Sequence, residues 1–292
     1  MWSPVVAGVD GSAESLAAAE WAAHEAVRRG RVLRLLHARS WHPRQDEAEF
    51  AHAGERHLAR RLLREAEERV LAACPDVPLY DEQVEGPVTA ALVKAADDAD
   101  PLVLGSRGLG RITGLLVGSV ALGVVAKATR PVVLVRADTA GQEEEAAGTG
   151  RRDVVLGVDV TEPCDEVLAF AYEAARLRHA RLRVLHAWRA PDPLTLGPGE
   201  IGLVGEPQRA EEWLGFLSAV LQVWRDKYPE VEVLQTVVEG KPSGALLKAA
   251  SGAELLVVGH RLTDRPRMPR TGPVTHAMIQ QAGCPVAVVP HY

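Results

Sequence analysis

The sequence predicts an α/β protein of two tandem domains, each a doubly wound, parallel, five-stranded α/β sandwich. Three observations predict this fold: the length of the chain, an internal repeat, and the alternation of short apolar runs with longer helical segments. The chain has 292 residues, which suits two domains of ordinary size. Its 47% hydrophobic and 25% charged residues are typical of a globular protein.

The repeat is visible by direct comparison of the two halves. The segment 5–10, Val-Val-Ala-Gly-Val-Asp, returns at 154–159 as Val-Val-Leu-Gly-Val-Asp. Leu-His-Ala at 36–38 returns at 185–187 with the same offset of 149 residues. Five later matches, among them the pair Gly118 and Gly272, share an offset of 154. Two constant offsets indicate two homologous domains, the second with a net insertion of five residues.

The segment between the repeats has the composition of a linker. Residues 138–152 are polar, contain glycine and show no hydrophobic periodicity. We therefore predict domains at residues 1–137 and 153–292. The insertion is expected in the stretch 194–205, which is rich in glycine and proline.

In the first half, strand and helix patterns alternate in the order that a parallel sheet requires. The apolar run at 5–9 predicts a strand buried on both faces. Ser12 is a suitable N-cap for a helix to Arg29, which Gly30 would end. The later elements are predicted as a strand at 32–38, a charged helix at 47–73, a strand at 79–84, a helix from Pro87 to about 96, a strand at 102–104, a helix at 114–129 and a strand at 132–135.

Three features of the first half are expected to meet at one rim of the sheet. Asp10, Ala38 and Gly105 lie at or just beyond strand ends, and doubly wound sheets bind ligands at the carboxyl ends of their strands. A glycine-rich run from Gly105 to Ser119 follows the fourth strand, and its bare backbone suits an anion such as phosphate. The alternative is that these glycines only permit close packing. The run is neither a Walker A loop nor a dinucleotide fingerprint.

The pattern resembles the universal stress protein family. Asp10 after the first strand, together with Gly105-x2-Gly108-x9-Gly118-Ser119, is similar to the ATP-binding signature of one branch of that family. The resemblance covers nearly the whole chain as a tandem of two such domains. It implies a fold like that of the adenine nucleotide alpha hydrolases.

The resemblance also implies roles for the glycine-rich run. The loop at 105–111 would wrap the phosphates of ATP, with Arg107 and Arg111 adding charge pairing. Residues 118–120 would make a second phosphate contact through the serine hydroxyl and backbone N–H groups.

Three residues outside this run complete the implied site. Asp10 would lie near the ribose and near Mg²⁺ or Mn²⁺ bridged by the phosphates; its alternative role is a helix N-cap. The backbone at Ala38 would read adenine, and Gly8 would form the floor of the cleft. The complete predicted set is Gly8, Asp10, Ala38, Gly105, Ser106, Arg107, Gly108, Leu109, Gly110, Arg111, Gly118, Ser119 and Val120.

The second half departs from the motif where a phosphate would bind. Leu262 and Asp264 replace two loop glycines, and Pro273 replaces Ser119, which removes a hydroxyl and a backbone N–H. Each lost partner in a buried site costs about 1–3 kcal/mol. Such losses together can abolish micromolar binding. We therefore predict one competent nucleotide site, in residues 1–137, and a degenerate second one.

The predicted function is that of an ATP-binding universal stress protein, a nucleotide-dependent regulator in the stress response. No triad, metal motif or carboxylate pair stands out in the sequence, so we predict no catalytic residues. His37 and His186 recur at equivalent places and are interpreted as strand-end histidines with satisfied rings rather than as catalysts. Slow ATP hydrolysis and a nucleotide-independent interaction scaffold are the alternatives.

The net charge and the hydropathy of the sequence limit which classes of partner can be expected. The net charge of −6 leaves no basic footprint for nucleic acid, and the longest apolar run, 114–126, is too short to span a membrane. Three distant cysteines and the lack of a signal-peptide pattern favour the cytoplasm. The short apolar strands at 132–135 and 286–289 are expected to pair within the chain as a pseudo-dimer. The sequence leaves open whether whole chains also form homodimers.

The apolar stripe of a helix at 211–224 is interpreted as core.

Overall fold

The computed structural model describes residues 3–39, 48–106, 118–137, 153–189, 206–262 and 271–292. Its first half contains β1 (Val5–Gly8), α1 (Ala13–Arg29), β2 (Leu33–Arg39), α2 (Ala48–Ala73), β3 (Leu79–Glu85), α3 (Val88–Asp97), β4 (Leu102–Gly105), α4 (Ser119–Val125) and β5 (Val132–Val135). Its second half contains β6 (Asp153–Gly157), α6 (Asp165–Leu177), β7 (Arg181–Trp188), α7 (Glu206–Lys227), β8 (Val233–Glu239), α8 (Pro242–Ala249), β9 (Leu255–Arg261), α9 (Pro273–Gln281) and β10 (Val286–His291).

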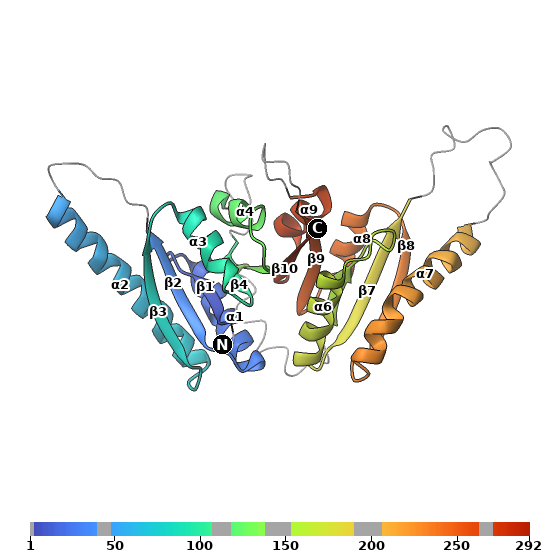
Figure 1. Ribbon diagram of the computed structural model, residues 1–292, viewed down its shortest axis with the longest axis horizontal. Coiled ribbons are helices and arrows are strands. Elements are labelled where there is room, and N and C mark those ends of the chain that lie inside the picture. The colour runs from blue at the N-terminus through green and yellow to red at the C-terminus, as the bar shows by residue number, and fades with distance from the viewer. Residues whose placement is uncertain (1–2, 40–47, 107–117, 138–152, 190–205, 263–270) are drawn as a thin grey trace.

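The strands form one ten-stranded sheet in the order β3-β2-β1-β4-β5-β10-β9-β6-β7-β8. Within each half, all neighbouring strands that the structure describes are parallel. The order within a half, 3-2-1-4-5, reverses direction beside the first strand, as it does in a doubly wound sheet. The predicted fold class is therefore confirmed (Figure 1).

The first helix begins and ends where its sequence signals predict. The Ser12 hydroxyl accepts a hydrogen bond from the Ser15 N–H at 3.2 Å, which satisfies one of the free donors of the first turn. Gly30 ends the helix in the left-handed conformation with a φ of 60°. A residue with a Cβ adopts this conformation only at a cost, so glycine is favoured there. For the predicted helix at 114–129, the described part is α4; residues 114–117 lie outside the described chain.

The two halves join through their last strands. β5 and β10 pair antiparallel, with Val133 opposite Ala287 at the centre of the register. This is the pairing that the apolar character of both strands predicts. Because the pair lies in the middle of the sheet, β3 and β8 become its outer strands. The described helices include none that is both long and apolar enough to cross a membrane.

Two apolar layers cover the faces of the sheet, and both halves contribute to each layer. One layer holds residues of α1, α2, α6 and α7 against the sheet, and the other holds residues of α3, α4, α8 and α9. Val133 and Ala287 belong to the first layer, whereas their neighbours Val132 and Val288 belong to the second. Since neither layer is interrupted at β5 and β10, the halves pack as one body.

A buried ion-pair network links α1 to the end of α6. The side chain of Glu25 is fully buried, and its carboxylate accepts from Arg29 at 2.6 Å and from Arg178 at 2.5 Å. Burial raises the pKa of Glu25, but the charges of Arg178 and Arg29 outweigh burial and lower the pKa to about 2. Nothing in the sequence pattern predicts this contact between residues of opposite halves.

The network follows the repeat. Arg29 and Arg178 are equivalent residues, and each also meets an acidic side chain of its own half, Asp100 and Glu254 respectively, at 3.2 Å. Each guanidinium lies 5.5 Å from the centre of an aromatic ring of the other half. Two members of the network break the symmetry: Glu25, whose equivalent is Ala174, and Arg28, which pairs with Glu25 and Glu254 and whose equivalent is Leu177.

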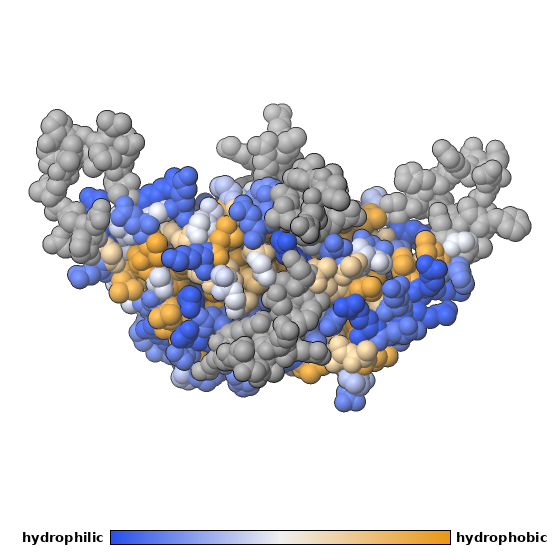
Figure 2. All heavy atoms as spheres, turned by 180° about the vertical axis from the view of Figure 1, so that it is seen from behind, coloured by the Kyte–Doolittle hydropathy of each residue, from blue (hydrophilic) through white to orange (hydrophobic). Residues whose placement is uncertain are grey.

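The apolar stripe of α7 is core only in part. Leu217 and Leu221 are fully buried, but Phe216 is 59% exposed and Leu214 is 40% exposed. α7 lies at the outer end of the molecule beside β8, so its exposed residues do not face the first half (Figure 1). Figure 2 shows the molecule from behind relative to Figure 1; on this face, apolar side chains form patches that are separated by hydrophilic side chains.

Candidate functional site

A cavity of about 280 Å³ lies at the carboxyl ends of β1, β2 and β4. It is lined by Gly8, Val9, Asp10, Ser12, Glu14, Ser15, Leu36, Ala38, Val88, Leu92, Leu104, Gly105, Gly118, Ser119, Val120 and Ala121. The structure thus brings together the predicted Gly8, Asp10, Ala38, Gly105, Gly118, Ser119 and Val120. The predicted Arg107, Gly108, Leu109, Gly110 and Arg111 lie outside the described residues.

Ser106 occupies a different environment from the other described members of the predicted set. It is buried and is not among the lining residues. Its N–H and its hydroxyl both donate to the Val135 carbonyl oxygen, at 2.7 and 3.3 Å. These bonds anchor the end of β4 to β5, so Ser106 positions the neighbouring Gly105.

The glycines that line the cavity differ in how closely they are packed, and this difference bears on whether close packing or ligand binding explains each of them. A Cβ at Gly105 would lie 2.6 Å from the backbone carbonyl carbon of Glu14, so this glycine lets β4 approach the first turn of α1. A Cβ at Gly8 would lie 2.6 Å from a methyl carbon of Leu104. Among the described residues, no atom lies within 4 Å of a Cβ added at Gly118, so packing against them does not explain that glycine.

We expect Gly105→Ala to lower the free energy of unfolding by about 1–3 kcal/mol, because the new methyl group overpacks against backbone that cannot rotate away. Urea denaturation measures this change. Gly215→Ala on α7 is the control, because no atom of the part of the chain that the structure describes lies within 4 Å of its added Cβ. It is expected to raise stability by about 0.5–1 kcal/mol through helix propensity. Equal stability of Gly105→Ala and the wild type would contradict the packing role.

Asp10 supports the helix cap without being the cap itself. Its Oδ1 accepts from the Ser12 N–H at 3.0 Å and from the Ser12 hydroxyl at 2.5 Å. The alternative that Asp10 is the N-cap is wrong, since Ser12 holds that position. In the second half, Asp159 makes the same two contacts with Thr161, at 3.0 and 2.7 Å. Both carboxylates are therefore held at the mouth of a cavity by the turn that follows.

Each of the two repeated histidines links the ends of two neighbouring strands. Nδ1 of His37 lies 2.7 Å from the Val9 carbonyl oxygen, and Nδ1 of His186 lies 3.1 Å from that of Val158. Each contact ties the end of β2 or β7 to the residue that precedes the cavity aspartate. Both histidines thus have a satisfied Nδ1, but the buried Nε2 of His186 has no hydrogen-bond partner among the described residues, so the prediction of a satisfied ring is wrong for His186.

The start of α4 offers backbone donors to the first cavity. The first helical bond runs from the Leu122 N–H to the Gly118 carbonyl at 3.1 Å. The N–H groups of residues 119–121 precede that bond, and all three residues line the cavity. In the second half, Pro273 is the first residue of α9, so the corresponding donor is missing.

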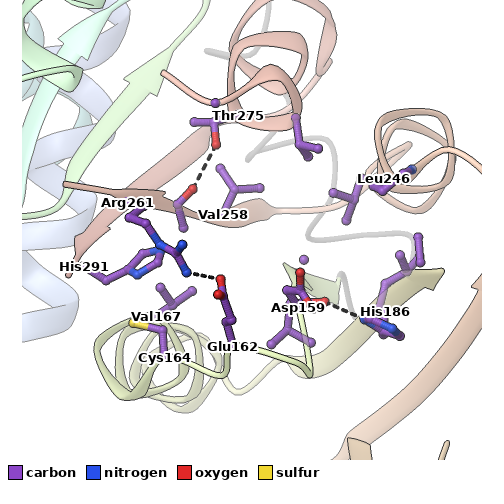
Figure 3. A pocket seen from close by; sticks show the side chains of 18 of the residues that line it. Asp159, Glu162, Cys164, Val167, His186, Leu246, Val258, Arg261, Thr275 and His291 are labelled. Atoms are coloured by element: carbon purple, nitrogen blue, oxygen red, sulfur yellow. Dashed lines mark hydrogen bonds and ion pairs between the residues drawn. The ribbon is translucent and has the colours of Figure 1, made fainter. Parts of the chain in front are cut away.

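The second half contains an equivalent cavity of about 330 Å³ (Figure 3). The repeat counterparts Gly157, Asp159, Leu185, Ala187, Leu246, Val258, Gly259, Gly272 and Pro273 line it. Of the predicted changes, Leu262 is not among the lining residues, and Asp264 lies outside the described residues. The cavity therefore persists although the motif has changed.

Sequence reasoning missed several polar residues of this second cavity. Glu162 and Arg261 form an ion pair across its mouth, and the Thr275 hydroxyl donates to the Gly259 carbonyl at 2.9 Å (Figure 3). Burial, together with the hydrogen bond that its thiol donates to a neighbouring carboxylate, raises the pKa of Cys164 to about 11. One of these residues could have been found from the sequence, because the repeat offset aligns Arg261 with Arg107 of the predicted phosphate loop.

Comparison with known proteins identifies the family. The model of the universal stress protein family matches residues 1–136 and 150–290. This chain belongs to the universal stress protein family. Universal stress proteins of Mycolicibacterium smegmatis and Mycobacterium tuberculosis are each 30% identical to it; they cover 98% and 97% of this chain, which spans 96% of each of them.

A solved structure agrees with this universal stress protein in architecture. The crystal structure of a universal stress protein from Archaeoglobus fulgidus matches 98% of both chains with a TM-score of 0.72 and 18% identity. At that identity the likeness shows the fold alone. Both halves of this universal stress protein thus carry the family's fold, and the tandem arrangement recurs in a solved structure.

Proposed function

We propose that the first half of this universal stress protein binds ATP in its cavity, and that nucleotide occupancy regulates the protein in the stress response. The observation that carries the proposal is the convergence of separate motif segments on one cavity. Asp10, Ala38, Gly105 and Ser119 come from the ends of three strands and the start of α4, and all line the same space. The predicted phosphate loop connects Gly105 to Gly118, and both of these residues are lining residues.

The lining suggests how the ligand divides between the two ends of the cavity. Apolar side chains, among them Leu36, Val88 and Leu92, suit a planar base next to the backbone of Ala38. The N–H groups of residues 119–121 and the Ser119 hydroxyl are donors for phosphate oxygens. Ligand cavities typically measure about 300–1,000 Å³. The 280 Å³ of this cavity lies just below that range.

A divalent cation fits this cavity only together with the nucleotide. No group of three or more His, Cys, Asp or Glu side chains in the described part of the chain is arranged to hold a metal. Asp10 and Glu14 are the acidic residues that line the first cavity. In our proposal the phosphate oxygens of ATP supply most ligands to Mg²⁺ or Mn²⁺, and Asp10 lies beside the ion.

Calorimetric titration with ATP and Mg²⁺ tests the proposal on the full chain. We expect one nucleotide per chain, because the second half lacks the Ser119 hydroxyl and one N–H donor. Mass spectrometry of nucleotide that co-purifies with the protein identifies the natural occupant. Absence of binding would contradict the proposal, and two equivalent ATP sites per chain would contradict the assignment of a single site.

Phosphate release separates a nucleotide-binding regulator from an ATPase. We expect no turnover above background from the wild type. Turnover that disappears in Asp10→Ala would instead assign slow hydrolysis to the same cavity.

A further inference from the structure

The second cavity keeps the apolar end of the first one. Much of its lining corresponds to that of the first cavity through the repeat, although Pro242 replaces Val88 and the counterparts of Glu162 and His186 do not line the first cavity. Gly157 corresponds to Gly8, Leu185 to Leu36, Ala187 to Ala38, Leu246 to Leu92 and Val258 to Leu104. The floor glycine packs closely in both cavities: a Cβ at Gly157 would lie 2.9 Å from two methyl carbons of Leu246, as one at Gly8 would lie 2.6 Å from a methyl carbon of Leu104. The space that suits a base in the first half is therefore present in the second.

The opposite end of the second cavity has changed in charge. Glu162 occupies the position of Ala13 and lines the cavity together with Asp159. Among the lining residues that the structure describes, Arg261, the counterpart of Arg107, is the one arginine or lysine, and its guanidinium is paired with Glu162. Figure 3 shows the two side chains facing each other across the mouth. The first cavity also has two acidic lining residues, Asp10 and Glu14, so what distinguishes this end of the second cavity is that Glu162 already engages its described arginine.

The hydrogen-bond donors at this end are also reduced. Pro273 has neither the N–H nor the hydroxyl of Ser119. The hydroxyl of Thr275, which replaces Ala121, donates to the Gly259 carbonyl at 2.9 Å and is not directed to a ligand. The described lining therefore keeps the features that suit a nucleoside and loses those that suit its phosphates.

We propose that the second cavity binds a neutral adenine nucleoside, adenosine, in preference to its phosphates. The choice of adenine rests on the proposed function of the first half, because it follows from the equivalence of the two apolar ends. Asp159 is held by Thr161 at the mouth as Asp10 is held by Ser12, and its carboxylate is an acceptor for ribose hydroxyls. The chain would then carry two unlike sites, one for ATP and one for its dephosphorylated nucleoside.

The first experiment measures adenosine binding to the second cavity alone. In full-length Ala38→Leu, the larger side chain fills the apolar end of the first cavity. Calorimetric titration of this variant is expected to show one adenosine per chain and ATP binding at least tenfold weaker. Adding Ala187→Leu, the matched change in the second cavity, is expected to remove the remaining adenosine binding. Absence of adenosine binding to Ala38→Leu, or ATP binding as tight as adenosine binding, would overturn the proposal.

The second experiment restores the phosphate end. Glu162→Ala with Pro273→Ser, made in the Ala38→Leu chain, introduces the residues of the first half at two exposed positions. ATP affinity is expected to rise at least tenfold, while adenosine affinity changes less than twofold. Unchanged ATP affinity would refute the charge argument. Failure of the wild type to bind ATP in its first cavity would contradict the proposed function, and adenosine binding in the Ala38→Leu chain would still decide the present inference.

Discussion

Glu25→Gln is expected to lower the free energy of unfolding by about 3–5 kcal/mol at pH 7. Glu25 is the acid that Arg29 and Arg178 share, so its loss leaves each of them with one acidic partner, and breaking a buried ion pair costs this range. The Arg178 side chain is only 1% exposed, so solvent cannot replace the lost carboxylate. Urea denaturation followed by circular dichroism measures the change.

Glu20→Gln is the matched control for this prediction. Glu20 lies on the same helix and also pairs with an arginine, Arg69, but both side chains are partly exposed. Exposed pairs contribute about 0–1 kcal/mol, so this variant is expected to stay near the wild type. Equal losses of unfolding free energy for Glu20→Gln and Glu25→Gln would show that the buried network contributes no more stability than an exposed ion pair.

The same carboxylate predicts a pH dependence with a defined sign. The pKa of Glu25 is about 2 in the folded protein, below its ordinary value of 4.5. The stabilisation is therefore fully present above pH 4.5 and is lost as the pH falls toward 2, and it amounts to about 3 kcal/mol. The stability difference between wild type and Glu25→Gln should shrink over this interval. A difference that stays constant down to pH 2 would contradict the low pKa.

The second large effect is expected from Gly118→Val, which should weaken ATP binding at least 100-fold, or by about 2.7 kcal/mol. Gly118 lines the first cavity at the start of α4, where the proposed phosphate contacts lie. Its φ of −59° and ψ of 137° suit any residue, and its added Cβ meets no atom of the described chain within 4 Å. The valine should therefore exclude the phosphate without disturbing the fold.

Gly272→Val is the control for this substitution in the second half. Gly272 likewise precedes a helix and has open space around its added Cβ. Both variants should unfold at the temperature of the wild type, and only Gly118→Val should lose ATP. ATP binding by Gly118→Val with unchanged affinity would refute the placement of phosphate at this glycine.

Local and periodic features made much of the fold predictable. Strands such as β1 and β5 are buried on both faces, so they appear in the sequence as uninterrupted apolar runs. Ser12 and Gly30 act on their immediate neighbours, so their residue types alone indicate the ends of α1. The cavity residues were predictable because the topology gathers the residues that follow different strands at one rim.

Features that depend on long-range contacts were not predictable. Glu25 and Arg178 are separated by 153 residues, and a charged residue on a helix is normally solvated. The exposure of Phe216 depends on α7 covering an outer strand, which leaves part of its apolar stripe without a partner. The pair of Glu162 with Arg261 also required the tertiary structure, because no spacing rule connects these residues.

The unequal residues at the junction of the halves have a consequence for recognition between them. One half supplies the acid Glu25 together with Arg28, where the other has Ala174 and Leu177, while the equivalent Arg29 and Arg178 come one from each half. Two first halves joined in this geometry would bring two buried carboxylates together, and two second halves would leave both arginines without this shared acid. The junction is therefore heterotypic: each half is complementary to the other and not to a copy of itself, although their folds are the same.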